Sequence, residues 1–104
     1  MTVTQISGHQ VHVDAEGFLT ESAEWDEDLA TALAGQIGIA LTEAHWKVLR
    51  FLRADYATRG ETATTRRVQA VGGVPVKEQF LLFPKKPAKK MAYVAGLPKP
   101  HGCV

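Results

Sequence analysis

A single cysteine near the end of this chain is the residue best suited to covalent chemistry. Cys103 is preceded by Gly102 and followed by Val104. A free cysteine is usually buried as a small hydrophobic side chain, but no core-forming element follows to cover this one. Chain ends are usually accessible unless they are tied down. The position therefore favours sulfur chemistry, in which a thiolate attacks a donor persulfide and carries its outer sulfur.

The residues just before the cysteine predict an extended, flexible arm. Pro98 and Pro100 cannot continue a helix because proline fixes φ and lacks an N–H donor. Gly102 adds a swivel directly before the thiol. Lys99 and His101 would favour the thiolate, whereas the terminal carboxylate would oppose it. We favour the interpretation that His101 is tolerated on a solvated arm over one in which it assists ionisation.

Composition bounds the class of protein. The chain has 104 residues, 45% of them hydrophobic and 22% charged, as in one ordinary globular domain. We expect no membrane span, because no run of about 18 apolar residues occurs, and no signal peptide. One cysteine cannot form an internal disulfide, which fits the reducing cytoplasm, and we expect a monomer. We expect no cofactor and no metal, since His9 and His12 lack a third ligand nearby.

Charge is distributed unevenly along the chain. Residues 1–60 hold four basic and nine acidic side chains, whereas residues 61–104 hold eight basic and two acidic ones. The basic half suits nucleic acid, an anionic partner or an anionic small molecule, and a solvated lysine-rich surface is the plainer alternative.

An N-terminal β-hairpin is predicted over residues 3–19. Val11 and Val13 alternate with polar neighbours, and residues 14–17 supply turn chemistry before Phe18. A lone hairpin is marginal in water, so it should pack on a helical body.

The longest helix is predicted between Thr42 and Gly60. Thr42 is a good N-cap, Leu41 and Trp46 occupy the positions of a hydrophobic staple, and Gly60 suits a helix end. His45 lies on the apolar face, where a hydrogen-bonded, half-buried histidine is favoured over a ligand or base.

Four shorter helices complete the predicted body: one from about Asp26 that weakens at Gly35, then Thr65 to Val71, Pro75 to Phe83, and Pro87 to Gly96. The fold class is mainly α (α+β), a compact helical bundle with the hairpin, in a winged helix-turn-helix outline. The body spans residues 1–96 and the mobile arm residues 97–104.

Two groups of residues are candidates for binding the arm or a partner. Arg50, Arg53 and Tyr56 suit a groove in which the arm folds back, although ion pairs and ordinary packing explain them equally well. The second group is lysine-rich and is equally explained as a solvated helix start: Lys85, Lys86, Lys89 and Lys90.

The C-terminal half resembles the DsrC/TusE/DsvC family, small cytoplasmic proteins of sulfur metabolism that include the gamma subunit of dissimilatory sulfite reductase. The resemblance rests on residues 82–90 and on 95–104, whose Gly-Leu-Pro-Lys-Pro-x-Gly-Cys-Val ending is highly specific. It extends upstream through residues 43–53 and 25–28, and so covers nearly the whole chain.

The resemblance implies a helical bundle with an N-terminal hairpin and a flexible arm, in which Cys103 accepts sulfur as a persulfide. Full DsrC proteins carry a second cysteine where this chain has Ala92, so the intramolecular disulfide and internal trisulfide of those proteins are excluded here. The chain looks like a single-cysteine, TusE-type relative. His101 is a second departure, since the family usually has a small hydroxyl residue there.

The resulting hypothesis is a sulfur relay rather than a self-contained enzyme. Sulfur-donor and sulfur-acceptor proteins are then the partners, as in tRNA 2-thiolation or dissimilatory sulfur metabolism. Two alternatives stay open: an accessory partner of dissimilatory sulfite reductase, with the arm inserted toward its siroheme, and a sulfur-responsive regulator that binds DNA through the basic half. DNA is the less favoured partner, because no helix with base-reading side chains is apparent.

Overall fold

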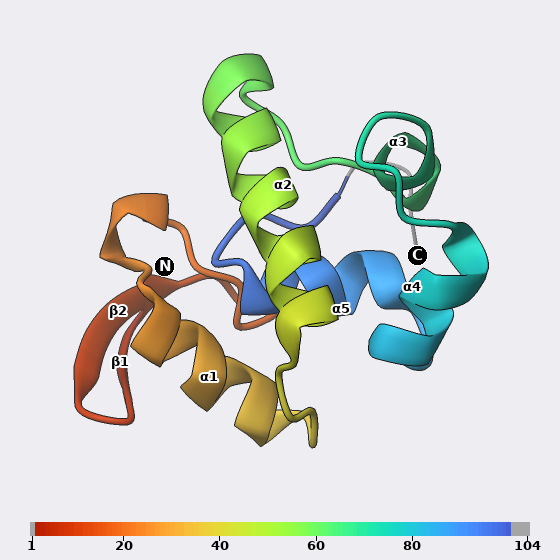
Figure 1. The fold of residues 1–104 in the computed structure, drawn as a ribbon. Coiled ribbons are helices and arrows are strands. Elements are labelled where there is room, and N and C mark those ends of the chain that lie inside the picture. The colour runs from red at the N-terminus through yellow and green to blue at the C-terminus, as the bar shows by residue number, and fades with distance from the viewer. Residues whose placement is uncertain (1, 101–104) are drawn as a thin grey trace.

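The computed structural model describes residues 2–100, which form an antiparallel hairpin followed by a helical body (Figure 1). The predicted mainly α bundle with an N-terminal hairpin is confirmed. Figure 1 shows the hairpin and α1 on one side of the central α2, and α3 and α4 on the other side. Within residues 2–100, no helix is long and apolar enough to cross a membrane.

The hairpin consists of β1 (Thr2–Ile6) and β2 (His9–Val13), with Ile6 opposite His9. Its two-residue turn is Ser7–Gly8, both at positive φ, as tight hairpin turns require. The prediction that residues 14–17 form the hairpin turn is therefore wrong. Those residues form a second turn, after which Leu19 returns to bridge with Val13.

The two strand histidines lie on opposite faces of β2, because side chains alternate along a strand. His9 Nε2 lies 2.9 Å from an Asp28 carboxylate oxygen, and His12 Nδ1 lies 2.7 Å from a Glu24 carboxylate oxygen. These contacts tie the hairpin to the segment that follows it. They also explain both histidines without a shared metal.

Helix α1 (Glu27–Gln36) begins where the acidic cluster predicts. The Asp26 carboxylate accepts a hydrogen bond from the Leu29 N–H at 2.7 Å and so caps a free donor of the first turn. Leu29 and Leu33 are fully buried against hairpin residues, including Val11. These residues form an apolar cluster, separate from the main core, that joins the hairpin to α1.

Helix α2 (Glu43–Arg59) is the longest helix and has the predicted ends. The Thr42 N–H donates to His45 Nδ1 at 3.0 Å, and Gly60 closes the helix at φ 74°. His45 Nε2 lies 2.8 Å from the Leu82 carbonyl, so this nitrogen carries the proton and donates. The interpretation of His45 as a buried, hydrogen-bonded residue is confirmed.

Three short helices follow: α3 (Thr65–Ala70), α4 (Val76–Leu82) and α5 (Pro87–Val94). Their starts and ends agree with the predicted turns to within two residues. Lys85 and Lys86 both have positive φ at the junction of α4 and α5, where non-glycine residues are rare. The main core lies between α2 and these helices, around Leu49, Leu52 and Phe83.

The chain leaves α5 through a turn at Gly96, which has φ 71° and is buried against Trp25. A Cβ at this glycine would lie 2.8 Å from Trp25 Cγ. We expect Gly96→Ala to lower the free energy of unfolding by about 2–3 kcal/mol, through left-handed strain plus this clash. Chemical denaturation measures the change.

Gly73→Ala is the matched control, because Gly73 has φ 73° but open space around its would-be Cβ. It should cost only the backbone strain, about 1 kcal/mol. Equal losses in the two variants would show that the Trp25 contact does not restrain the turn.

Candidate functional site at the base of the arm

The residues expected to carry the chemistry lie at the end of the chain. Cys103, His101 and Gly102 fall outside the described residues, so the reactive end of the site stays a prediction. The structure describes the base of the arm, from Leu97 to Pro100.

The base of the arm packs on the body rather than extending freely from it. Leu97 is 1% exposed, its N–H donates to the Ala92 carbonyl at 3.0 Å, and Pro100 is buried. The Thr62 hydroxyl donates to the Pro98 carbonyl at 2.7 Å. In Figure 1 the segment after α5 passes behind α2 toward the α3 side. Residues 97–100 thus have a defined place on the body.

Arg53 contacts the turn through which the chain leaves α5 and enters the arm. Its guanidinium lies over the Trp25 ring, 4.2 Å from the ring centroid, and donates to the Ala95 and Ser22 carbonyls at 2.9 and 3.1 Å. Burial lowers the pKa of Arg53 below its usual value, yet an arginine keeps its charge at neutral pH. The indole N–H of Trp25 donates to the Val94 carbonyl at 2.8 Å.

These bonds satisfy carbonyls that a helix end leaves free. The last carbonyls of α5 have no partner within the helix, and a cation is favourable near that negative end of the dipole. Trp25 and Arg53 supply donors for two of them. The side chains therefore determine how the chain leaves α5.

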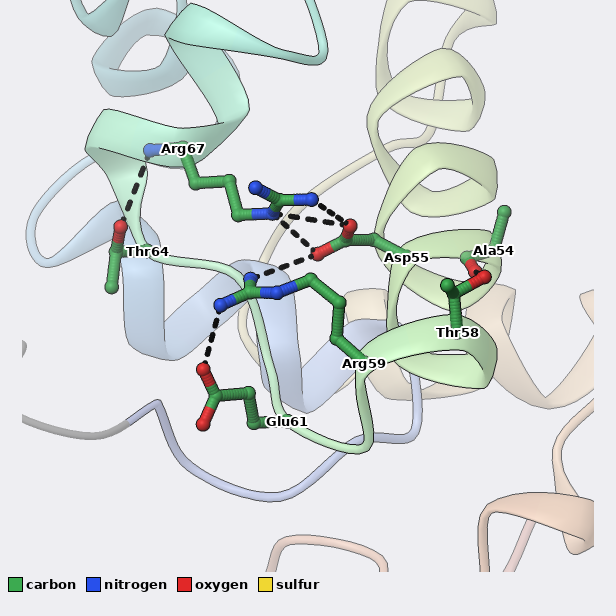
Figure 2. Close-up of polar contacts among 7 residues, drawn as sticks. All are labelled: Ala54, Asp55, Thr58, Arg59, Glu61, Thr64 and Arg67. Atoms are coloured by element: carbon green, nitrogen blue, oxygen red, sulfur yellow. Dashed lines mark hydrogen bonds and ion pairs between the residues drawn. The ribbon is translucent and has the colours of Figure 1, made fainter.

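A network of ion pairs holds the loop that contacts Pro98 (Figure 2). Asp55 is almost buried at the end of α2 and accepts hydrogen bonds from Arg67 at 2.6–3.1 Å and from Arg59 at 3.3 Å. Arg59 also bonds Glu61 at 2.7 Å. The network joins α2 to α3 across residues 61–64, the loop that carries Thr62.

The other two residues of the first candidate group, Arg50 and Tyr56, have separate places. Arg50 is exposed and lies 4.0 Å from Glu27, and Tyr56 packs against the main core. Of this group, only Arg53 bonds the end of α5 in the described part of the chain, through the Ala95 carbonyl just before the arm.

The four lysines around the start of α5 do not form one cluster. Lys85 and Lys86 are exposed, Lys90 donates to the Pro84 carbonyl, and Lys89 lies 3.8 Å from Glu16. Lys99, on the arm itself, lies 3.4 Å from the same Glu16 carboxylate. Glu16 thus connects the arm to the turn that follows the hairpin, a contact that sequence reasoning missed.

Sequence reasoning also missed the contacts of Thr62 and Trp25. Both residues act through backbone carbonyls distant in sequence, and such bonds leave no periodic signal. Only the resemblance drew attention to the region around Trp25.

Ala92, where full DsrC proteins have their second cysteine, is fully buried in α5. Its carbonyl receives the Leu97 N–H and so takes part in the turn toward the arm.

The hairpin, the small helical body and the lone cysteine after the last helix together characterise one class of small protein. A family model described as "DsrC like protein" matches residues 5–104. The chain belongs to this family, which confirms the predicted resemblance.

Two sequence relatives match this chain over nearly their whole length. "Sulfurtransferase TusE" of Yersinia pseudotuberculosis is 41% identical, over 96% of this chain and 99% of the relative. The protein of the same name from Escherichia coli K12 is 38% identical over 93% and 95%.

Solved structures agree with the sequence relatives. The gamma subunit of dissimilatory sulfite reductase (DsrC) from Archaeoglobus fulgidus, in its oxidised form, superposes with a TM-score of 0.78 at 36% identity, covering 99% of this chain and 100% of that one. The structure called dissimilatory sulfite reductase I (DsrI) superposes at 0.85 with 34% identity and the same coverage.

The Asp55 network should make stability depend on pH at the acidic end. The Arg67 hydrogen bonds hold the pKa of Asp55 below its usual 3.8, so the stabilisation is fully present above that pH and is lost as pH falls below it. We expect Asp55→Asn to lower the melting temperature at pH 7 by about 5 °C, and the difference from wild type to shrink below about pH 3.8.

Differential scanning calorimetry across this pH range measures the effect. Glu61→Gln removes an exposed partner of Arg59 and should change the melting temperature by about 1 °C at most. A deficit for Asp55→Asn that persists unchanged at pH 2 would contradict the assignment.

Proposed function

We propose that this protein is a sulfur relay that carries sulfane sulfur as a persulfide on Cys103 and passes it to a partner protein. The observation that carries the proposal is the place of this lone cysteine, five residues beyond an anchored Pro98, in a family whose matched members include sulfurtransferases.

The chemistry needs no cofactor and no net oxidation. The Cys103 thiolate attacks the outer sulfur of a donor persulfide; the new S–S bond forms as the donor's S–S bond breaks, and the donor cysteine leaves as a thiolate. Delivery repeats the exchange, with a nucleophile of the acceptor attacking the outer sulfur on Cys103. The protein is then regenerated with its thiol reduced.

Ala92 limits how the sulfur can leave. Because the chain has one cysteine, no second thiol of this protein can attack the persulfide. The acceptor must supply the nucleophile, or a reductant must release the sulfur. This division suits a relay step between two proteins better than a cycle closed within one chain.

We place the relay in the cytoplasm, acting as a monomer between a donor and an acceptor protein. The relatives called TusE are named as sulfurtransferases, and tRNA 2-thiolation is the destination we favour. His101 is assigned no step, and the lysines Lys85 and Lys86 are exposed enough to meet an acidic partner.

A second candidate is an accessory partner of dissimilatory sulfite reductase. The similar structures DsrC and DsrI are both named after dissimilatory sulfite reductase. Insertion of an arm into such an enzyme needs only one cysteine. Copurification of a tagged protein with a siroheme enzyme would favour this candidate. A DNA-binding role has less support. Arg67 of the basic half is already paired with Asp55, and the hairpin, which would be the wing of a winged helix-turn-helix, lies on the opposite side of α2 from α3 (Figure 1).

The test is the intact mass of the reduced protein after incubation with inorganic polysulfide, or with a cysteine desulfurase and cysteine. We expect a gain of one sulfur atom that dithiothreitol reverses. Cys103→Ser should gain none, with an unchanged circular dichroism spectrum, because a hydroxyl replaces a thiol of similar size.

A wild-type protein that stays unmodified with both donors, while Cys103 still alkylates with iodoacetamide, would contradict the carrier function. Binding to duplex DNA that weakens steeply with salt would then favour the regulator.

A further inference from the structure

Three side chains from three separate segments donate hydrogen bonds to backbone carbonyls of one short stretch. Trp25, before α1, bonds Val94; Arg53, on α2, bonds Ala95; and Thr62, on the loop after α2, bonds Pro98. We call Trp25, Arg53 and Thr62 the carbonyl clasp. The donor–acceptor distances of 2.8, 2.9 and 2.7 Å are those of well-formed hydrogen bonds.

The composition of the arm explains why its carbonyls are the groups held. Pro98 and Pro100 have no N–H, so this part of the backbone offers mainly acceptors for binding to the body. Trp25 and Arg53 bond the end of α5, as ordinary helix-end partners do. The Thr62 bond lies beyond the helix, four residues past Val94, where it acts on the extended segment itself.

We infer that the carbonyl clasp positions Cys103 for exchange with a protein partner. Its members are positioning residues, because they act through the backbone carbonyls of Val94, Ala95 and Pro98. The inference rests on the proposed relay function.

The clasp can influence the position of the thiol because only a short segment separates Cys103 from the last anchored residue. Cys103 is five residues past Pro98, so the two are at most about 17 Å apart. The position of the Pro98 carbonyl therefore sets the centre of the volume that the thiol can reach, and release of this carbonyl would displace that volume. Exchange between two protein-bound sulfurs requires the reacting atoms to come within contact distance, so such a displacement matters.

A small diffusing donor has no such requirement. Inorganic polysulfide can approach an exposed thiol from any accessible direction, whereas a protein donor presents its persulfide from one docked position. Loss of the clasp should therefore slow exchange with proteins and leave exchange with polysulfide nearly unchanged.

The lone cysteine allows a direct measurement of position. Nitroxide labels at Cys103 and at Lys47→Cys, an exposed site on α2, report the distance from arm to body by double electron–electron resonance. Relative to the labelled wild type, we expect Thr62→Val and Arg53→Met to broaden the distance distribution and to shift its mean by about 5 Å.

The chain offers a matched control for each variant. Thr58 bonds the Ala54 carbonyl within α2 as Thr62 bonds Pro98, and Figure 2 shows it there on the helix; Thr58→Val should leave the distribution unchanged. Arg50→Met removes an exposed arginine one turn before Arg53 and should also have no effect. Thr62→Val changes only a hydroxyl to a methyl, so it keeps the test valid if Arg53→Met fails to fold.

The functional readout is the ratio of two loading rates of Cys103, from a cysteine desulfurase with cysteine and from inorganic polysulfide. We expect Thr62→Val and Arg53→Met to lower this ratio about 5- to 10-fold, with partial rescue in Arg53→Lys and none of the loss in Thr58→Val.

The outcomes separate the inference from the proposed function. Distance distributions identical to wild type in both clasp variants would overturn the inference, whatever the loading rates. A shifted distribution with an unchanged ratio would also overturn it, because position would then not govern delivery. Failure of the wild type to take sulfur from polysulfide would instead contradict the carrier function.

Discussion

The turn from α5 into the arm depends on one set of interactions, the contacts of the half-buried Arg53 guanidinium with Trp25 and two backbone carbonyls. A charge taken out of water is costly unless hydrogen bonds and opposing dipoles replace its hydration. Here the Trp25 ring face and the carbonyls of Ala95 and Ser22 supply that replacement. One side chain thereby joins α2, the segment before α1 and the turn at the end of α5, so those segments cannot move independently.

Helix α2 distributes charge to both sides of this arrangement. Arg53 and Asp55 are two residues apart, and residues so spaced point to different sides of a helix. Arg53 meets the end of α5, while Asp55 meets Arg67 of α3 and thereby secures the loop of Thr62. The same helix thus bonds the end of α5 at Ala95 directly and supports the arm base at Pro98 through the loop of Thr62.

The proposed relay divides the roles within a small protein. In that proposal the reacting group is the single thiol of Cys103, and the rest of the protein supplies placement and a surface for partners. An alanine at position 92, fully buried in α5, leaves the carrier without a resolving thiol of its own, so turnover depends on the acceptor. In this proposal, the stability of the protein and the delivery of sulfur are connected, because hydrogen bonds to neighbouring carbonyls complete the end of α5 and hold the arm base.

Much of the fold was predictable because its signals are local. Asp26, Thr42 and Gly60 mark helix ends through bonds within a few residues, and they mark them correctly. The hairpin turn was misplaced because residues 14–17 have turn chemistry as good as that of Ser7–Gly8, and only pairing in space distinguishes the two.

By itself, the sequence determined the family, the mainly α class, the lone Cys103 and the loss of a second cysteine at Ala92. Only the tertiary structure decided how the arm leaves the body. The contacts that decide this join residues 36 to 83 positions apart, from Thr62 to Pro98, Trp25 to Val94 and Glu16 to Lys99. Side-chain bonds to distant carbonyls depend on where the backbone passes, and no spacing pattern along the chain encodes that.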